Sequence, residues 1–137
     1  MKFTDPFGTD TLRSRIYVVS DQGRVLYVGL AKHSSVGQRL AMHLENSVSS
    51  RKRSRFANLL RENHPTYLDW RIDAWSVTEC SALVGRTLPS LEAAEQAIYD
   101  FYARRDGIHP VGNSSRPSGR PRKRKAAEAY SLAQAER

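Results

Sequence analysis

Five side chains of the types that act on phosphate esters are spread along the chain: Tyr17, Tyr27, Arg39, His43 and Glu95. Cleavage of a phosphodiester needs a deprotonated nucleophile, a cation on the phosphate and stabilisation of the leaving oxygen. A carboxylate holds a divalent metal ion, an arginine neutralises developing charge, and a tyrosine or a histidine accepts a proton. These residue types are sufficient for that chemistry if the fold brings them together.

The two tyrosines lie on segments that predict a β-hairpin. Residues 15–19 and 24–30 are rich in β-branched and aromatic types, and the residues between them are typical of a turn. A three-residue loop would place Gly23 in the left-handed conformation that such hairpins need. This register pairs Tyr17 directly with Tyr27, about 5 Å apart on one face. Both faces of the hairpin are largely apolar, so we expect helices on each side.

The arginine and the histidine lie on a predicted helix. Apolar residues at helical spacing predict this helix from Val36 to about Ser47, with Arg39 and His43 one turn apart on its flank. A second helix is expected at 55–63 and a third strand at 68–77, whereas residues 78–87 fit either element.

The glutamate lies on the last predicted helix, which has Ser90 as its N-cap and ends at 104 or 105, before Gly107. In the first turn of this helix, the macrodipole alone explains a carboxylate at Glu92. Glu95 instead borders the apolar stripe of the helix, where a charge usually has a partner. Glu95 is therefore the candidate metal ligand.

The order of these pieces resembles a known family. Arg15-Ile16-Tyr17, ten residues before Tyr27-Val28-Gly29, is similar to the paired tripeptides that name the GIY-YIG nucleases. The similarity continues through Arg39, Glu95 and Pro110-Val111-Gly112-Asn113, over roughly residues 14–113. Arg15 replaces the first glycine of the family's name, and eighteen residues separate Glu95 from Asn113, more than in many members. The resemblance implies an α+β fold, a small three-stranded antiparallel sheet flanked by helices.

The resemblance also implies roles for these residues in a metal-dependent DNA endonuclease. Tyr17 would be the general base, or would position the attacking water, with a pKa lowered near the metal. Tyr27 would hydrogen-bond the water or the scissile phosphate, and Arg39 would contact that phosphate. Glu95 would be the sole protein ligand of Mg²⁺ or Mn²⁺.

Two further residues enter by the same resemblance. His43 matches a histidine that some members use beside the arginine, and Asn113 would anchor the segment after the last helix and orient the site. Without the other residues, packing of two strand aromatics on one another would be the better interpretation of the two tyrosines. The arginine and the histidine could likewise be an ordinary polar helix flank.

The net charge of +8 comes from two short clusters. The first consists of Arg51, Lys52, Arg53 and Arg55, and the second of Arg116, Arg120, Arg122, Lys123, Arg124 and Lys125. The other 12 lysines and arginines are outnumbered by 14 aspartates and glutamates. Counterion release makes such clusters natural contacts for a phosphate backbone, so we expect DNA as the partner, with RNA as an open alternative. Anionic membranes and acidic proteins also attract basic tails.

The length of 137 residues suits one domain. We expect a loose lead-in at 1–13, the nuclease-like domain at 14–113, and a basic, disordered tail at 114–137 with a marginal helix from 126 onward. No apolar run approaches the roughly 20 residues that cross a bilayer, and the first residues do not resemble a secretory signal. Cys80 is alone and cannot form an internal disulfide. We therefore expect a cytoplasmic protein without membrane contact.

Two other classes of protein fit parts of these observations. One is a catalytically inactive module of the same fold that holds DNA or RNA through its basic clusters. The presence of all four catalytic side-chain types argues against it. The other is a nucleoid or RNA-binding protein of unrelated fold, which leaves the spacing as coincidence. The chain offers little surface to read base edges, so the target, the number of strands cut, and a homodimer or a recruiting protein partner stay open.

Overall fold

The computed structural model describes residues 2–3, 12–49 and 53–121. Several expectations therefore lie outside the described residues. They concern Arg51, Lys52, Arg122, Lys123, Arg124, Lys125 and the helix expected from 126 onward.

A two-residue turn joins the central strands β2 (Arg15–Asp21) and β3 (Arg24–Ala31). Gln22 and Gly23 both have positive φ, 50° and 84°, which suits the twist of a tight hairpin. The expected left-handed conformation of Gly23 is confirmed. The expected three-residue loop is wrong, because Asp21 already pairs with Arg24.

The register of this hairpin differs from the prediction. An irregularity between Val19 and Ser20 shifts the pairing, so Tyr17 lies opposite Gly29 and Tyr27 lies opposite Val19. The direct Tyr17–Tyr27 pair is therefore wrong. Both rings still lie on the same face as diagonal neighbours, with ring centroids 5.9 Å apart.

Gly29 leaves the space that these rings occupy. A Cβ atom at this position would lie 2.5 Å from Oη of Tyr17 and 2.7 Å from Cε1 of Tyr27. Real Cβ atoms do not approach other heavy atoms so closely, so any side chain here would push the tyrosines apart.

Two more strands complete the sheet, in the order β1-β4-β2-β3. The strand β4 (Arg71–Trp75) runs antiparallel to β2, and the two-residue β1 (Lys2–Phe3) adds a short parallel pairing to β4. The three-stranded antiparallel sheet flanked by four helices confirms the predicted α+β class. As β3 is an outer strand, one of its edges faces away from the sheet.

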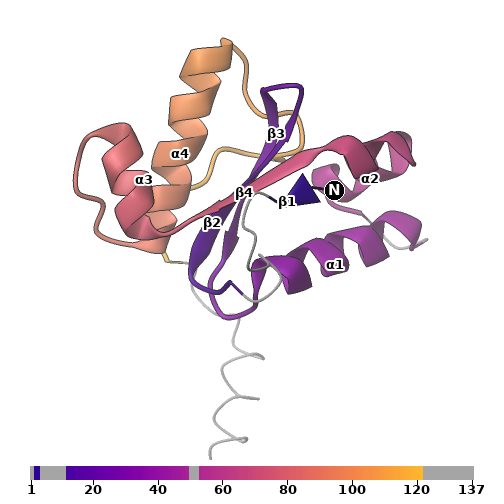
Figure 1. Cartoon of the computed structure of the whole chain (residues 1–137), viewed down its shortest axis with the longest axis horizontal. Helices are drawn as coiled ribbons and strands as arrows, with labels where there is room; N and C mark the ends of the chain where they lie inside the picture. Colours follow the sequence, from indigo (N-terminus) through magenta and orange to yellow (C-terminus); the bar gives the residue numbers. More distant parts are fainter. Residues whose placement is uncertain (1, 4–11, 50–52, 122–137) are drawn as a thin grey trace, which may run out of the picture.

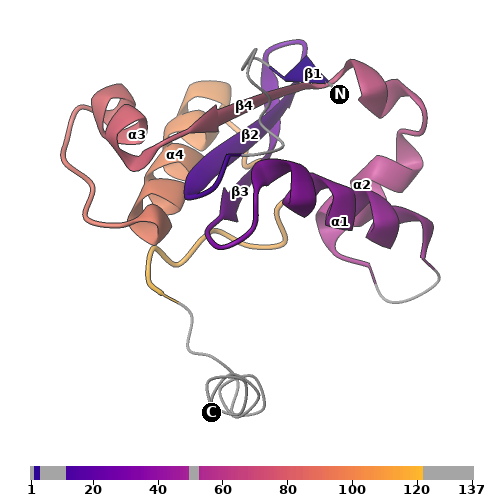
Figure 2. The same cartoon turned by 60° about the horizontal axis from the view of Figure 1, so that its bottom comes forward.

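Helices cover both faces of the sheet, as the apolar pattern predicts (Figures 1 and 2). The helices α1 (Val36–Val48) and α2 (Arg55–Glu62) lie on one face, and α3 (Val77–Val84) and α4 (Leu91–Asp106) lie on the other. Each helix begins at a serine whose hydroxyl accepts a hydrogen bond from a backbone N–H in the first turn. Within the described ranges, none of these helices has the length and apolarity required to span a membrane.

The region between β4 and α4 shows where the predicted boundaries fail. Residues 66–69 form a 3₁₀ turn, η1 (Thr66–Asp69), so the third strand is shorter than the predicted 68–77. Ser76 ends that strand by capping α3, and Glu79 completes a capping box with it. The unassigned segment 78–87 is therefore mostly helix, closed by Gly85 at a φ of 75°.

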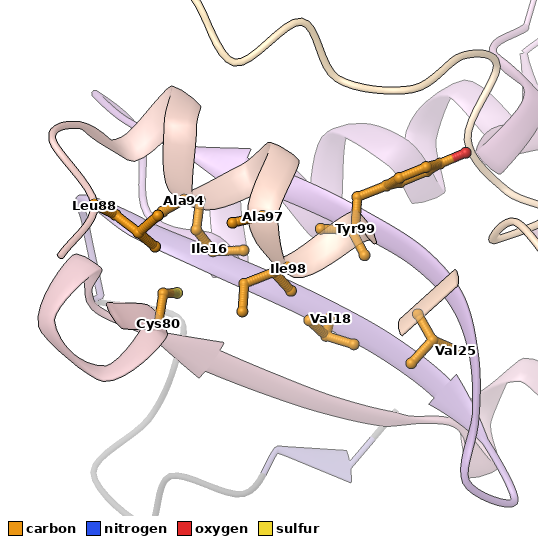
Figure 3. Close-up of a cluster of buried hydrophobic side chains, with 10 residues drawn as sticks. Ile16, Val18, Val25, Cys80, Leu88, Ala94, Ala97, Ile98 and Tyr99 are labelled. Atoms are coloured by element: carbon orange, nitrogen blue, oxygen red, sulfur yellow. The ribbon is translucent and has the colours of Figure 1, made fainter. Parts of the chain in front are cut away.

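Each sheet face has its own core. Aliphatic side chains dominate the core under α3 and α4, where Ile16, Val18, Val28 and Ile98 are at most 2% exposed (Figure 3). The core under α1 and α2 is richer in aromatic rings, with Tyr17, Tyr27, Phe56, Tyr67 and Trp70, whereas the other core contains Trp75, Tyr99 and Tyr102.

Candidate active site

An open cavity of about 1080 Å³ lies along β3, between α1 and the first half of α4. Five of the six predicted catalytic residues line it: Tyr27, Arg39, His43, Glu95 and Asn113. Tyr17, the sixth, is fully buried and does not line the cavity.

The cavity forms where the two sheet faces meet. Tyr27, Arg39 and His43 belong to the layer of α1 and α2, whereas Glu95 comes from α4, which covers the opposite face. Val28 and Leu30 of β3 also line the cavity, so it runs past the outer edge of the sheet. An outer strand is therefore what allows residues from both faces to share one space.

A packed aromatic cluster forms part of the cavity wall. The ring of Tyr27 stacks on Phe56 from α2, with centroids 4.1 Å apart and planes at 8°. His43 meets both rings edge-on, at 5.4 Å from Tyr27 and 4.9 Å from Phe56. Tyr17 lies behind this cluster, with its Oη 3.1 Å from Nε2 of His43. Phe56 lies on the helix expected at 55–63 and was not among the predicted site residues.

Burial sets the protonation state of the two polar members of this cluster. It raises the pKa of Tyr17 well above its ordinary value; Tyr27 also raises it, while Arg39 opposes the rise. The family resemblance implies a lowered pKa for Tyr17 beside a bound metal, whereas the protein side chains by themselves raise it. Burial, and next the charge of Arg39, lower the pKa of His43 to about 4. At neutral pH the phenol of Tyr17 therefore keeps its proton, and His43 is uncharged.

Two nitrogens at the cavity are buried without a hydrogen-bond partner among the described residues: Nε of Arg39 and Nδ1 of His43. The guanidinium makes a weak contact through Nη1 with Sδ of Met42, at 3.9 Å. A buried donor without an acceptor costs about 1–3 kcal/mol, so natural proteins rarely leave one without reason.

Glu92 and Glu95 both line the cavity, but they differ in their surroundings. Glu92 is 9% exposed and accepts a hydrogen bond from Lys32 at 2.7 Å, and this contact lowers the pKa of the carboxyl. The dipole explanation for Glu92 is thus incomplete, because Lys32 binds it as well. Nothing in the spacing of residues 32 and 92 signals this pair. Glu95 is half-buried, one helical turn further along.

The residues present fit a magnesium or manganese ion held by one carboxylate. No group of three or more histidine, cysteine, aspartate or glutamate side chains occurs within the described residues. Mg²⁺ commonly takes one or two protein carboxylates and completes its shell with water and substrate phosphates. Glu95, which lines the cavity and is the ligand that the family resemblance implies, would hold the ion. The unpartnered Arg39 Nε would donate to the same phosphate.

Asn113 ties the segment after α4 to the outer edge of β3. Its Nδ2 donates to the carbonyl of Val28 at 2.9 Å, and its Oδ1 accepts from the N–H of Val28 at 3.0 Å. The N–H of Gly112 donates to the carbonyl of Leu26 at 2.7 Å. These bonds occupy backbone groups beside Tyr27, which is the anchoring position expected for Asn113.

Residues 114–121, expected as the start of a disordered tail, lie against α4 instead. Arg116 makes two hydrogen bonds to Asp100, at 2.6 and 2.8 Å, and Gln96 donates to the carbonyl of Pro117. The predicted start of the tail is too early, because Arg116 forms an ion pair with Asp100 of α4. This segment forms one wall of the cavity and brings Arg120 to its lining.

The described members of the first basic cluster do not act alike. Arg53 donates to the carbonyl of Ser49 and to Oδ1 of Asn58, so it helps to close the loop before α2. Arg55 is exposed on the first turn of that helix. Of these two arginines, Arg55 is the one exposed to solvent, where a phosphate could contact it.

Comparisons with known proteins add nothing to this geometry: no family model matches the chain, and no curated protein and no solved structure does either.

Proposed function

We propose that this protein is a metal-dependent endonuclease that hydrolyses DNA phosphodiester bonds. One observation carries the proposal: Tyr27, Arg39, His43 and Glu95, which the family resemblance selects, line a single open cavity. These side chains come from a strand and two helices on opposite sheet faces, so packing of one core does not explain their meeting.

The residues divide the work as follows. Arg39 binds the scissile phosphate and neutralises the charge that develops on it. Glu95 would hold the metal ion, which when bound would supply a Lewis acid to water and phosphate. Tyr27 presents its hydroxyl to the attacking water or to the phosphate. Tyr17 is a positioning residue in this scheme, because it is buried behind Tyr27 and hydrogen-bonded to His43.

The DNA contacts come from the basic residues around the cavity. Lys32, Arg116 and Arg120 line it, and Arg55 is exposed at the start of α2. Such contacts bind phosphates of any sequence and give an affinity that falls with salt.

The test is cleavage of plasmid, branched, single-stranded and RNA substrates by the full chain with Mg²⁺ or Mn²⁺. We expect metal-dependent cleavage of DNA, and we expect Glu95→Gln to reduce it to background while the protein stays folded by circular dichroism. Glu92→Gln is the matched control and should retain most of the activity. Salt-dependent binding without cleavage under every condition would instead identify an inactive nucleic-acid-binding module.

A further inference from the structure

Arg39 Nε and His43 Nδ1 both lack a hydrogen-bond partner among the residues that the structure describes, and they lie on the same helix at the same cavity. They are the only buried side-chain nitrogens or oxygens in the described part of the chain that make no hydrogen bond. They come from residues one turn apart on α1, and both residues line the same cavity. Two such atoms on residues one helical turn apart, both in the lining of one open cavity, indicate a ligand that would satisfy both.

The chemistry of Arg39 fixes what that ligand must provide. A guanidinium has donors only, so Nε requires an acceptor atom. Lys32, Arg116 and Arg120 add positive charge to the cavity lining, although Glu92 and Asp100 neutralise the first two. An oxyanion is the acceptor that such a site favours.

The chemistry of His43 depends on which ring nitrogen holds its one proton. Oη of Tyr17 lies 3.1 Å from Nε2, and the buried phenol keeps its own proton. Contact with Tyr27 favours the protonated phenol and raises the pKa of Tyr17, whereas Arg39 lowers it, so the positive guanidinium acts on the phenol oxygen as a donor would. The phenol proton then has the lone pair of Nε2 as its acceptor, because an imidazole nitrogen is a stronger base than a second phenol.

We infer that Tyr17 holds His43 as the tautomer with its N–H on Nδ1, so that Arg39 Nε–H and His43 Nδ1–H together bind one phosphate group. The inference rests on the proposed function for the identity of the substrate, and it changes the part that two residues play in it. His43 donates a hydrogen bond to a phosphate oxygen and does not accept a proton. Tyr17 acts through His43 and never touches the substrate.

The decisive measurement is ¹⁵N NMR of the histidine and arginine side chains of the full chain at pH 7.5, with a chelator present. Long-range ¹H–¹⁵N correlations distinguish the two neutral tautomers of His43. Inorganic phosphate is then titrated as the probe. We expect a protonated Nδ1 and an unprotonated Nε2, and we expect phosphate to shift the resonances of Nδ1 and of Arg39 Nε.

Two variants separate the role of Tyr17 from simple packing. Tyr17→Phe removes the hydroxyl and keeps the ring, so His43 should shift toward the Nε2–H tautomer and phosphate affinity should fall about tenfold. Tyr67→Phe is the matched control, because Tyr67 is a half-buried tyrosine of the same core that does not line the cavity. It should change neither measurement.

An Nε2–H tautomer in the wild-type protein would overturn the inference, since the Tyr17 proton would then point to Tyr27. Phosphate that shifts neither nitrogen would also overturn it, and water would then be their partner. The wild-type spectra decide this even if Tyr17→Phe does not fold. None of these readouts requires cleavage, so a protein that cleaves DNA with His43 in the other tautomer refutes only this inference. One that binds phosphate as described and never cleaves refutes only the nuclease.

Discussion

The two hydrophobic cores, one on each face of the sheet, differ in their side chains. Under α3 and α4 the core is mainly aliphatic, with Trp75, Tyr99 and Tyr102 as its aromatic members, and its one thiol, Cys80, has a pKa raised to about 12 by burial and by Glu79. Under α1 and α2 a tyrosine, a histidine and two further aromatic rings pack together, and two buried nitrogens lack partners. Among the described residues, the buried side-chain atoms that lack partners belong to the second face alone, and such groups are typical of a functional site.

The largest effect should come from the aliphatic face. Ile98→Ala removes a fully buried side chain from the core of α4, and such substitutions cost about 2–5 kcal/mol of unfolding free energy. Cleavage by the folded fraction should be unchanged, because Ile98 does not line the cavity. Urea denaturation and cleavage assays at low temperature measure the two quantities.

Leu83→Ala is the control for this substitution, since Leu83 is 40% exposed on α3. It should change the unfolding free energy by no more than about 0.5 kcal/mol. If Ile98→Ala left stability intact but abolished cleavage in the folded protein, the division of labour between the two faces would be wrong.

The polar face should make stability depend on pH. The pKa of His43 is lowered to about 4 in the folded protein, against an ordinary value of 6.5. The unfolded chain therefore binds the proton first, so the contribution is complete above pH 6.5 and is lost as the pH falls toward 4. Between pH 7.5 and pH 5 the loss should be about 2 kcal/mol.

Urea denaturation at several pH values, compared between variants, isolates this contribution from the carboxylates. His43→Gln should flatten the dependence between pH 7.5 and pH 5. His64→Gln is the control, because His64 is exposed, and it should leave the slope as it is. An unchanged slope in His43→Gln would mean that His43 is not buried and neutral.

Much of this fold follows from the sequence because local signals and burial agree. Alternating and helical apolar patterns place both central strands and α1, α2 and α4, and serine caps mark where helices begin. The helix α3 had a readable signal as well, the Ser76–Glu79 capping box. The predicted third strand, 68–77, extends beyond β4 at both ends, because apolar spacing alone does not separate a strand from the turns beside it.

The sequence predicted which residues form the site, but it did not predict how deeply each of them is buried. The register shift at Val19 and the burial of Tyr17 depend on how rings pack above Gly29, which is a tertiary effect. Family resemblance selected Tyr17 as a base, whereas its surroundings raise its pKa. The same limit applies to Lys32, which joins Glu92 across 60 residues of sequence.

The smallest effect concerns that pair. Glu92→Gln removes the charge that Lys32 binds at 2.7 Å and the favourable dipole term in the first turn of α4. As the Lys32 side chain is 45% exposed, solvent screens the pair, and the loss should be about 1 kcal/mol at pH 7. The contact with Lys32 lowers the pKa of Glu92, so this stability is present above the ordinary value of 4.5 and disappears as the pH falls below it. The unfolding free energies of Glu92→Gln and wild type should therefore converge in acid.

Glu92, which links the end of β3 to α4 through Lys32, should affect cleavage far less than Glu95 does. If Glu92→Gln abolished cleavage and Glu95→Gln did not, the metal ligand would be Glu92, and Lys32 would be its regulator.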